Sequence, residues 1–179
     1  RNLARLSAAG IPVVTVQHGS GTAGGAYMPG LSDVVIMVRG RSRAFLAGPP
    51  LLKAATGEVA TEEELGGAEM HTSVSGLGEY LAEDDRHALG IAREVLKQLR
   101  SKQSGSDSNY SEHRQPAKQF ESAPEDSEEM LGLMPASHRE PVDMREVMLR
   151  LVDDARLLEF KPLYGGATVC AQGHIGGHA

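Results

Sequence analysis

A run of glycines and other small residues at positions 18–29 is the strongest candidate for chemistry in this sequence. It follows a β-branched run at residues 11–16, which has the pattern of a short buried strand. If a helix begins here, Gly24 and Gly25 offer two adjacent backbone N–H groups with no side chains in the way. Such a pair can stabilise a developing oxyanion. Spacing alone is equally compatible with a tight strand-to-helix turn that binds no ligand.

The same glycines, in the spacing Gly19-x-Gly21-x-x-Gly24, also match the fingerprint of dinucleotide-binding folds. That fold needs a helix rising from the glycines and an acidic residue at the end of the next strand, for the ribose. Here the next apolar run ends in Arg39, and Pro29 limits any helix to a short turn. We therefore disfavour a dinucleotide site.

Cys170, His174 and His178 have side chains of the kind that bind metals. A spacing of four residues brings such side chains together only on a helix, and Gly173 and Gly176 disfavour a helix there. The pattern also lacks a fourth ligand. We expect a strand followed by a glycine turn, with no metal.

Acidic residues gather at 62–64 and 83–85, and paired carboxylates can do acid–base chemistry. Both runs precede expected helices, where acidic side chains act as caps and favour the helix dipole. The sequence shows no Ser/His/Asp triad, nucleophile elbow or phosphate-binding lysine motif. We expect these carboxylates to be helix caps and solvated surface groups.

Length and composition restrict the class of protein further. The 179 residues carry a formal net charge of −6 and are 40% hydrophobic, which suits one globular domain or one domain and part of another. The single cysteine excludes an internal disulfide framework, no apolar run is long enough for a membrane span, and the acidic balance gives no argument for nucleic acid. The 21 glycines with only 4% aromatics indicate closely packed turns. Because the sequence begins with Arg1, we interpret it as a fragment.

Strand and helix patterns alternate along the chain, which indicates an α/β fold. A polar stretch at 101–127 buries too little apolar surface to fold alone and is interpreted as a linker. The expected strands are residues 11–16, 34–38, 44–47, 157–160 and 168–171. The expected helices are residues 51–55, a short turn after a capping box at 61–64, residues 83–100 with an apolar stripe, and residues 142–152.

Longer stretches resemble a known family. Residues 23–33 (AGGAYMPGLSD) resemble the signature of the carboxyltransferase β subunits of biotin-dependent acyl-CoA carboxylases. Residues 45–58 (FLAGPPLLKAATGE) and 64–71 (ELGGAEMH) resemble the next two blocks of that family, in the right order. Residues 141–147 and 159–165 are similar to the start of its second half. The resemblance covers roughly residues 1–100 and 128–170.

The resemblance implies a crotonase-like fold, a spiral of ββα units used twice in a full subunit. Residues 1–100 would be the C-terminal part of the first carboxyltransferase domain, and residues 128–179 the truncated start of the second. The family transfers a carboxyl group from carboxybiotin to an acyl-CoA through an enolate, with no side-chain nucleophile. The resemblance implies that Gly24 and Gly25 form the backbone oxyanion hole, which we assign to the thioester enolate, with the biotin ureido oxygen as the alternative. It places Ala23, Ala26, Tyr27, Gly48 and Pro49 in substrate binding.

Within the family, residues 48–58 and Met28-Pro29 are most similar to enzymes acting on branched enoyl-CoAs, the methylcrotonyl- and geranyl-CoA carboxylases. The alternatives are a propionyl- or acetyl-CoA carboxylase β subunit, another crotonase-type enzyme, and a truncated subunit that only assembles with partners. The second-half glycine hole of the family has no match here, so we expect this polypeptide alone to be inactive.

The resemblance also implies cofactor, partners and location. Biotin would be carried by a partner, the α subunit with biotin carboxylase and biotin carrier functions, and not attached to this chain. The β subunits would form a homo-oligomer, with no nucleic acid or membrane partner. The expected location is the cytoplasm, or the mitochondrial matrix if the source is eukaryotic.

Overall fold

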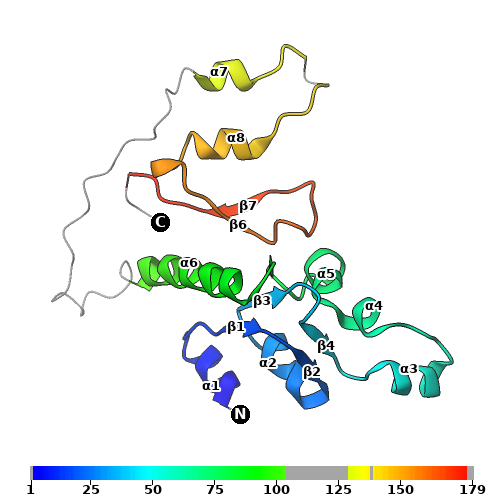
Figure 1. The fold of residues 1–179 in the computed structure, drawn as a ribbon. Helices are drawn as coiled ribbons and strands as arrows, with labels where there is room; N and C mark the ends of the chain where they lie inside the picture. The colour runs from blue at the N-terminus through cyan, green and yellow to red at the C-terminus, as the bar shows by residue number, and fades with distance from the viewer. Residues whose placement is uncertain (1, 104–128, 138, 177–179) are drawn as a thin grey trace. The chain divides into compact units, whose positions relative to one another are not determined.

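The structure is a computed structural model that describes residues 2–103, 129–137 and 139–176 (Figure 1). The described chain forms two compact units. The first contains Arg1–Leu96 together with Lys161–Thr168, and the second contains Lys97–Phe160 and Val169–Ala179. Of the stretch predicted as a linker, residues 101–103 continue a helix, and 104–127 lie outside the described residues.

A three-stranded parallel sheet forms the centre of the first unit. Its order is β1 (Val14–Gln17), β3 (Val34–Val38), β5 (Tyr80–Ala82), with Val14 opposite Val34 and Ile36 opposite Tyr80. The middle strand β3 is apolar throughout and has the bounds predicted for it. Its side chains from residue 35 to residue 38 are at most 1% exposed, because the strand has a neighbour on each side and is covered on both faces.

A second parallel ladder positions the glycine run. Strand β2 (Ser20–Thr22) pairs with β4 (Arg43–Phe45), with Gly21 opposite Ala44. The chain then leaves β2 through the 3₁₀ turn η1 (Ala23–Ala26) into the short helix α2 (Tyr27–Gly30). The sequence predicted the strand near residue 44, whereas β2 is too short and glycine-rich to give a strand pattern.

Local signals explain where the helices of this unit begin and end. Helix α3 (Pro49–Thr56) has proline in its first turn and ends at Gly57, whose φ of 77° suits glycine. Helix α4 (Glu62–Gly66) begins with the predicted capping box, in which the Thr61 hydroxyl accepts from the Glu64 N–H at 3.2 Å. The remaining helical elements are α1 (Asn2–Ala8), α5 (Ala68–Met70), the π-helical turn η2 (His71–Ser75) and α6 (Asp85–Gln103).

Helix α6 confirms the predicted amphipathic pattern in part. Ala88, Ala92 and Val95 are buried, at 0%, 8% and 3% exposure. Leu89 and Leu96, which the sequence placed on the same stripe, are about half exposed. The buried face is therefore narrower than the stripe of apolar residues.

The second unit is small. It contains helices α7 (Glu129–Leu133) and α8 (Met144–Leu149), the turn η4 (Asp153–Ala155) and an antiparallel pair of β6 (Leu158–Phe160) and β7 (Cys170–Gln172). Asp143 caps α8 by accepting from the Arg145 N–H at 3.0 Å. The Arg145 guanidinium holds both carboxylate oxygens of Glu159, at 2.8 and 2.6 Å. The predicted helix and the first predicted strand are present with shorter bounds, and the second strand begins two residues later and ends one residue later than predicted.

The close approach of α4 to β4 generates a prediction about Gly66. A Cβ at this position would collide with the Ala44 carbonyl and lie 2.8 Å from Cδ1 of Phe45. Gly66→Ala should therefore lower the free energy of unfolding by about 1–3 kcal/mol through overpacking. Gly90→Ala in α6 is the matched control, because a Cβ there meets nothing within 4 Å and alanine is about 1 kcal/mol better than glycine in a helix. Chemical denaturation of the two variants measures this difference, and equal stabilities would contradict the close contact.

Candidate active site

The turn η1 presents Gly24 and Gly25 at the end of β2. Its first residue, Ala23, has a φ of 49°, which is uncommon for a residue with a side chain and makes the turn sharp. The first N–H groups of a helix have no carbonyl partner within it. In η1 these include the amides of Gly24 and Gly25, the pair that the sequence predicts to be an oxyanion hole.

Neither packing nor backbone conformation requires glycine at these two positions. A Cβ at Gly24 or at Gly25 would meet no atom within 4 Å, and neither residue has a φ in the left-handed region. A structural turn would need glycine for one of these reasons, as Gly66 and Gly57 do. The open space beside both amides is the property that a ligand approaching the backbone requires.

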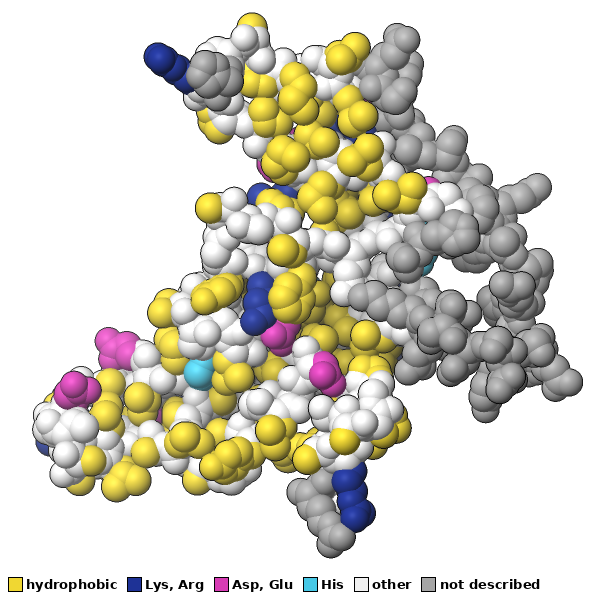
Figure 2. All heavy atoms as spheres, turned by 180° about the vertical axis from the view of Figure 1, so that it is seen from behind, with side chains coloured by type: hydrophobic (Ala, Val, Ile, Leu, Met, Phe, Trp, Pro, Cys, Tyr) yellow, Lys and Arg dark blue, Asp and Glu magenta, His cyan; other side chains and the backbone are white. Residues whose placement is uncertain are grey.

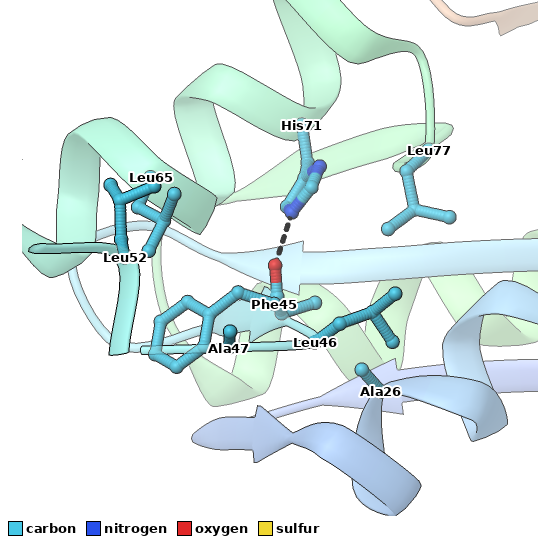
Figure 3. A pocket seen from close by; sticks show the side chains of 9 residues that line it. Ala26, Phe45, Leu46, Ala47, Leu52, Leu65, His71 and Leu77 are labelled. Atoms are coloured by element: carbon cyan, nitrogen blue, oxygen red, sulfur yellow. Dashed lines mark hydrogen bonds between the residues drawn. The ribbon is translucent and has the colours of Figure 1, made fainter. Parts of the chain in front are cut away.

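An apolar cavity lies next to this turn (Figure 3). Its volume is about 460 Å³, within the range of about 300–1,000 Å³ that small-molecule sites occupy. Ala26 of η1 forms part of the cavity wall. It directly follows Gly25 in the sequence, so the glycine turn adjoins the cavity. The other lining residues come from β4 and the loop after it, α3, α4, η2 and the turn after η2: Ala44, Phe45, Leu46, Ala47, Leu52, Leu65, His71 and Leu77.

Among the described residues that line the cavity, His71 is the one ionisable side chain, and both of its ring nitrogens are engaged; one of the two contacts is drawn in Figure 3. Nε2 lies 2.6 Å from the Ala44 carbonyl oxygen, and Nδ1 lies 2.7 Å from the Ser75 hydroxyl. Because a carbonyl only accepts, Nε2 carries the hydrogen. The ring is 9% exposed and joins η2 to β4, so it shapes the cavity and has no free nitrogen to act as a base.

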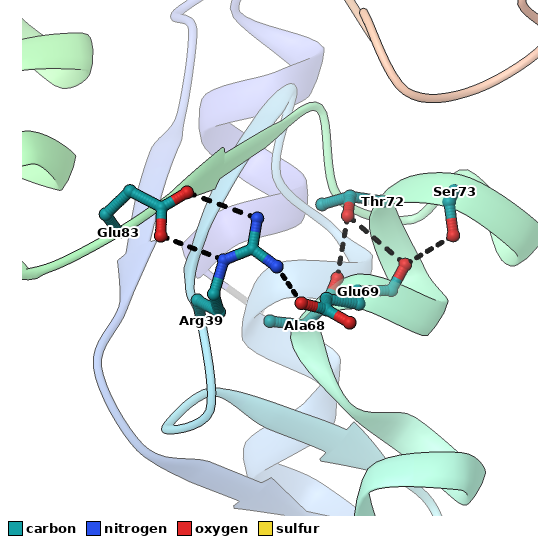
Figure 4. A network of polar contacts seen from close by, with 6 residues as sticks. All are labelled: Arg39, Ala68, Glu69, Thr72, Ser73 and Glu83. Atoms are coloured by element: carbon teal, nitrogen blue, oxygen red, sulfur yellow. Dashed lines mark hydrogen bonds and ion pairs between the residues drawn. The ribbon is translucent and has the colours of Figure 1, made fainter.

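Charged groups gather where the strands of the central sheet end (Figure 4). Arg39, directly after β3, donates to both carboxylate oxygens of Glu83 at 2.9 and 3.1 Å and also pairs with Glu69. The hydroxyls of Thr72 and Ser73 donate to nearby backbone carbonyls, at 2.9 Å to Ala68 O and 2.7 Å to Glu69 O, which fixes the helix that carries Glu69.

A second exposed group joins the loops after β1 and β3 to the start of α6. Nδ1 of His18 lies 2.8 Å from Asp85, and Arg41 lies 3.2 Å from the same carboxylate. The hydrogen bond from His18 holds the pKa of Asp85 below its usual value. Glu64 is a helix cap, as predicted, and Glu83 and Asp85 form ion pairs with basic side chains. In the described part of the chain, the acidic runs place no pair of carboxylates at the cavity.

Of the five predicted substrate-binding residues, one lines the cavity, whereas Ala23, Tyr27, Gly48 and Pro49 are not among its lining residues. Ala26 lines it, and Tyr27 opens α2 with 58% of its surface exposed. Gly48 and Pro49 begin α3, directly after the lining residue Ala47. Sequence reasoning did not single out Phe45, Leu46, Leu65, His71 or Leu77 as site residues, although they lie in or near the blocks that carry the family resemblance.

The two competing motifs receive no support. Helix α2 spans only Tyr27–Gly30, too short for the crossover helix of a dinucleotide-binding unit. Among the described residues, no three His, Cys, Asp or Glu side chains gather as a metal site; His178 lies outside them. In the same part of the chain, no helix has both the length and the apolar character to cross a membrane.

The family model of the carboxyl transferase domain matches residues 1–179. The chain belongs to the carboxyl transferase family. Over 179 residues it is 46% identical to a probable biotin-dependent acyl-coenzyme A carboxylase β2 subunit of Mycobacterium tuberculosis, covering 99% of this chain and 32% of that protein. It is 41% identical to a probable mitochondrial methylcrotonoyl-CoA carboxylase β chain of Drosophila melanogaster, with the same two shares. This carboxyl transferase chain therefore spans about a third of the length of its relatives.

Solved structures of related carboxylases align with this chain and confirm the predicted crotonase-like fold. A transcarboxylase 12S structure with methylmalonyl-coenzyme A bound aligns with a TM-score of 0.78 at 30% identity, covering 93% of this chain and 31% of that one. The β subunit of P. aeruginosa geranyl-CoA carboxylase aligns with a TM-score of 0.52 at 46% identity, covering 99% and 31%.

The hydrogen bond from His71 to Ala44 generates a prediction for this carboxyl transferase chain. His71→Leu removes the donor to a buried carbonyl, and this should lower the free energy of unfolding by about 1–3 kcal/mol. Ser75→Ala, the comparison variant, removes the partner of Nδ1 and the acceptor of the Leu77 N–H but leaves the Ala44 carbonyl paired, and should cost about 0.5–1.5 kcal/mol. Thermal unfolding of both variants measures the difference. A greater loss for Ser75→Ala would contradict the importance of the Nε2 contact that joins η2 to β4.

Proposed function

We propose that this chain provides the acyl-CoA site of the carboxyltransferase component of a biotin-dependent acyl-CoA carboxylase. The observation that carries the proposal is the pair of glycine amides, Gly24 and Gly25, in a turn that does not need glycine and opens beside an apolar cavity. Family membership adds the reaction type, since carboxylase β subunits are among the relatives.

The role of the turn follows from the charge that develops in the reaction. Removing a proton from the carbon next to a thioester, or from its vinylogous γ carbon, moves negative charge onto the thioester oxygen. The N–H groups of Gly24 and Gly25 would donate to that oxygen and stabilise the enolate more than the ground state. The backbone conformation of Ala23 orients the N–H groups of Gly24 and Gly25. The open space beside these two residues lets the thioester oxygen come within hydrogen-bonding distance.

The described residues beside the turn suit a reaction in which a partner supplies both the carboxyl donor and the proton acceptor. Beside the turn stand apolar side chains and His71, both of whose nitrogens are occupied, so the chain offers no general base there. Carboxybiotin, bound on a partner subunit, would supply the carboxyl group. This chain would hold the acyl-CoA, orient its thioester and exclude water from the enolate.

The cavity favours assigning the glycine pair to the acyl-CoA over the biotin ureido group. Its lining by Ala26, Phe45, Leu46, Leu52 and Leu65 suits a hydrocarbon chain. We propose a branched enoyl-CoA, such as methylcrotonyl- or geranyl-CoA, as substrate. Relatives named for each support this choice, at 41% and 46% identity. An acetyl-/propionyl-coenzyme A carboxylase β5 subunit is a weaker match at 36%.

We also propose a biotin-carrying α subunit and further β subunits as partners. Large apolar side chains are abundant on the surface in Figure 2, and Tyr27, Met28 and Leu31 beside the glycine turn are each more than half exposed. Apolar patches of this kind mark protein interfaces. The transcarboxylase 12S relative is described as a hexamer. For the location we propose the cytoplasm or the mitochondrial matrix; the D. melanogaster relative is named as mitochondrial.

The glycine pair provides the test of the proposed function. Gly24→Val places a side chain where the thioester must approach. With the carboxylase assembled with its biotin partner, carboxylation of methylcrotonyl-CoA should fall by about a hundredfold or more, as on loss of an oxyanion donor. Calorimetry on this chain should show weaker acyl-CoA binding.

Gly30→Val is the matched control for this test, since a Cβ at Gly30 also meets nothing within 4 Å and that glycine does not adjoin the cavity. The control should bind and turn over acyl-CoA as the wild type does. Equal binding and turnover in the Gly24→Val variant would refute the oxyanion role of this turn.

A further inference from the structure

We infer that Lys161 and Tyr164, which lie far along the chain from the glycine turn, are positioning residues that hold one wall of the acyl cavity. The wall is the turn Gly76–Glu79, between η2 and β5, which contributes Leu77 to the cavity. The inference rests on the proposed function for its consequence in catalysis. The contacts that carry it lie within the first compact unit, to which Lys161–Thr168 belongs.

The first contact is a hydrogen bond between backbone and ammonium. Nζ of Lys161 donates to the Gly76 carbonyl oxygen at 2.6 Å, across 85 residues of sequence. Gly76 has a φ of 71° and ends η2, so its carbonyl sets the direction in which the chain enters the turn. Lys161 itself has a φ of 52°, and such a conformation persists only where the surrounding contacts hold it.

The second contact is an ion pair that reaches the central sheet. Nζ of Lys161 lies 3.3 Å from Oε1 of Glu79, whose side chain is 9% exposed. Oε2 of the same carboxylate accepts from the Val35 N–H at 2.5 Å. Glu79 is therefore a buried carboxylate that needs both donors, and it connects Lys161 to the beginning of β3.

The third contact is made by an aromatic ring. Three ring carbons of Tyr164 lie 3.2–3.3 Å from the place where a Cβ of Gly76 would stand, so the ring packs directly on the glycine backbone. Nζ of Lys161 is 5.8 Å from the centroid of this ring. Lys161 and Tyr164 thus hold the same peptide from two sides.

The cavity side of the turn is linked to these contacts. Leu77 lines the cavity, and its N–H donates to the Ser75 hydroxyl, which lies 2.7 Å from Nδ1 of the lining residue His71. A shift of Gly76 would move Leu77 and loosen His71 together. The side chains that meet an acyl chain are therefore positioned by residues that do not line the cavity.

Hydrogen exchange of this chain tests the contacts directly. Lys161→Met keeps most of the aliphatic stem and removes the ammonium. Amides 77–79 should then exchange about tenfold faster or more, because a hydrogen bond to a charged group is lost. Lys161→Arg should restore slow exchange, and Tyr164→Leu should give an intermediate rate. Arg145→Met, which removes an ion pair in the second unit, should leave amides 77–79 unchanged.

The assembled carboxylase tests the consequence for catalysis. In the Lys161→Met enzyme, KM for a branched enoyl-CoA should rise about tenfold, the size of effect expected from a changed apolar pocket contact. The kcat should be unchanged, because Gly24 and Gly25 are untouched. If Lys161→Met fails to fold, the double variant Lys161→Met/Glu79→Gln, which leaves no unpaired buried charge, replaces it in both measurements.

Each outcome decides a different part of the inference. Unchanged exchange at 77–79 in a folded variant would overturn the holding role of Lys161. Faster exchange with an unchanged KM would overturn its role in the acyl cavity. If the wild-type carboxylase accepts no acyl-CoA, the proposed function fails, together with the catalytic consequence, whereas the exchange rates still decide whether Lys161 holds the turn.

Discussion

Burial of β3 from Val35 to Val38 is the constraint on which the rest of the first unit depends. A buried strand must satisfy every backbone N–H and C=O without water. The parallel neighbours β1 and β5 supply most partners, and two polar side chains complete the set: Glu79 accepts from the Val35 N–H and the Ser42 hydroxyl from the Val38 N–H. Ser42 also donates to the Gln17 carbonyl and so ties β1 to the same end of the strand. Both polar groups are buried because the strand needs them there.

Glycines in this fold serve three different physical purposes. Gly66 allows α4 to approach β4 with no side chain between them, and Gly76 adopts a backbone conformation that other residues rarely adopt. Gly24 and Gly25 meet neither requirement, and this contrast separates them from the other two. Gly30 and Gly90 also meet nothing within 4 Å, so the position of Gly24 and Gly25 beside the cavity is what supports an approaching thioester oxygen as their proposed partner.

Much of this fold could be predicted from the sequence, because its strongest elements have local signals. The apolar run of β3, the capping box of α4 and the buried alanines of α6 could each be read from a few consecutive residues. Strand β5 has only three residues, Tyr80–Ala82, and follows the polar Glu79, so it gave no strand pattern. The family blocks identified the glycine turn and the reaction type, which periodicity alone left open between a ligand site and a plain turn.

The cavity could not be predicted in the same way, because seven elements and loops contribute to it and no single stretch has the pattern of a pocket. The contact of Lys161 with Gly76 joins residues 85 positions apart, and a single sequence carries no signal for such a pair. The division into domains at residues 100 and 128 stays a prediction. The grouping of Lys161–Thr168 with the first compact unit is information that only the three-dimensional structure supplies.

The distance along the chain between Glu79 and Lys161 has a consequence for biosynthesis. A ribosome releases the strands of the central sheet well before it has made the lysine whose ammonium pairs with that buried carboxylate. Until then, the nascent first unit holds a carboxylate inside its core with only a backbone amide as partner. The first unit therefore completes its folding only after Lys161 has left the ribosome, and chaperones that bind incomplete domains can act on it during this interval.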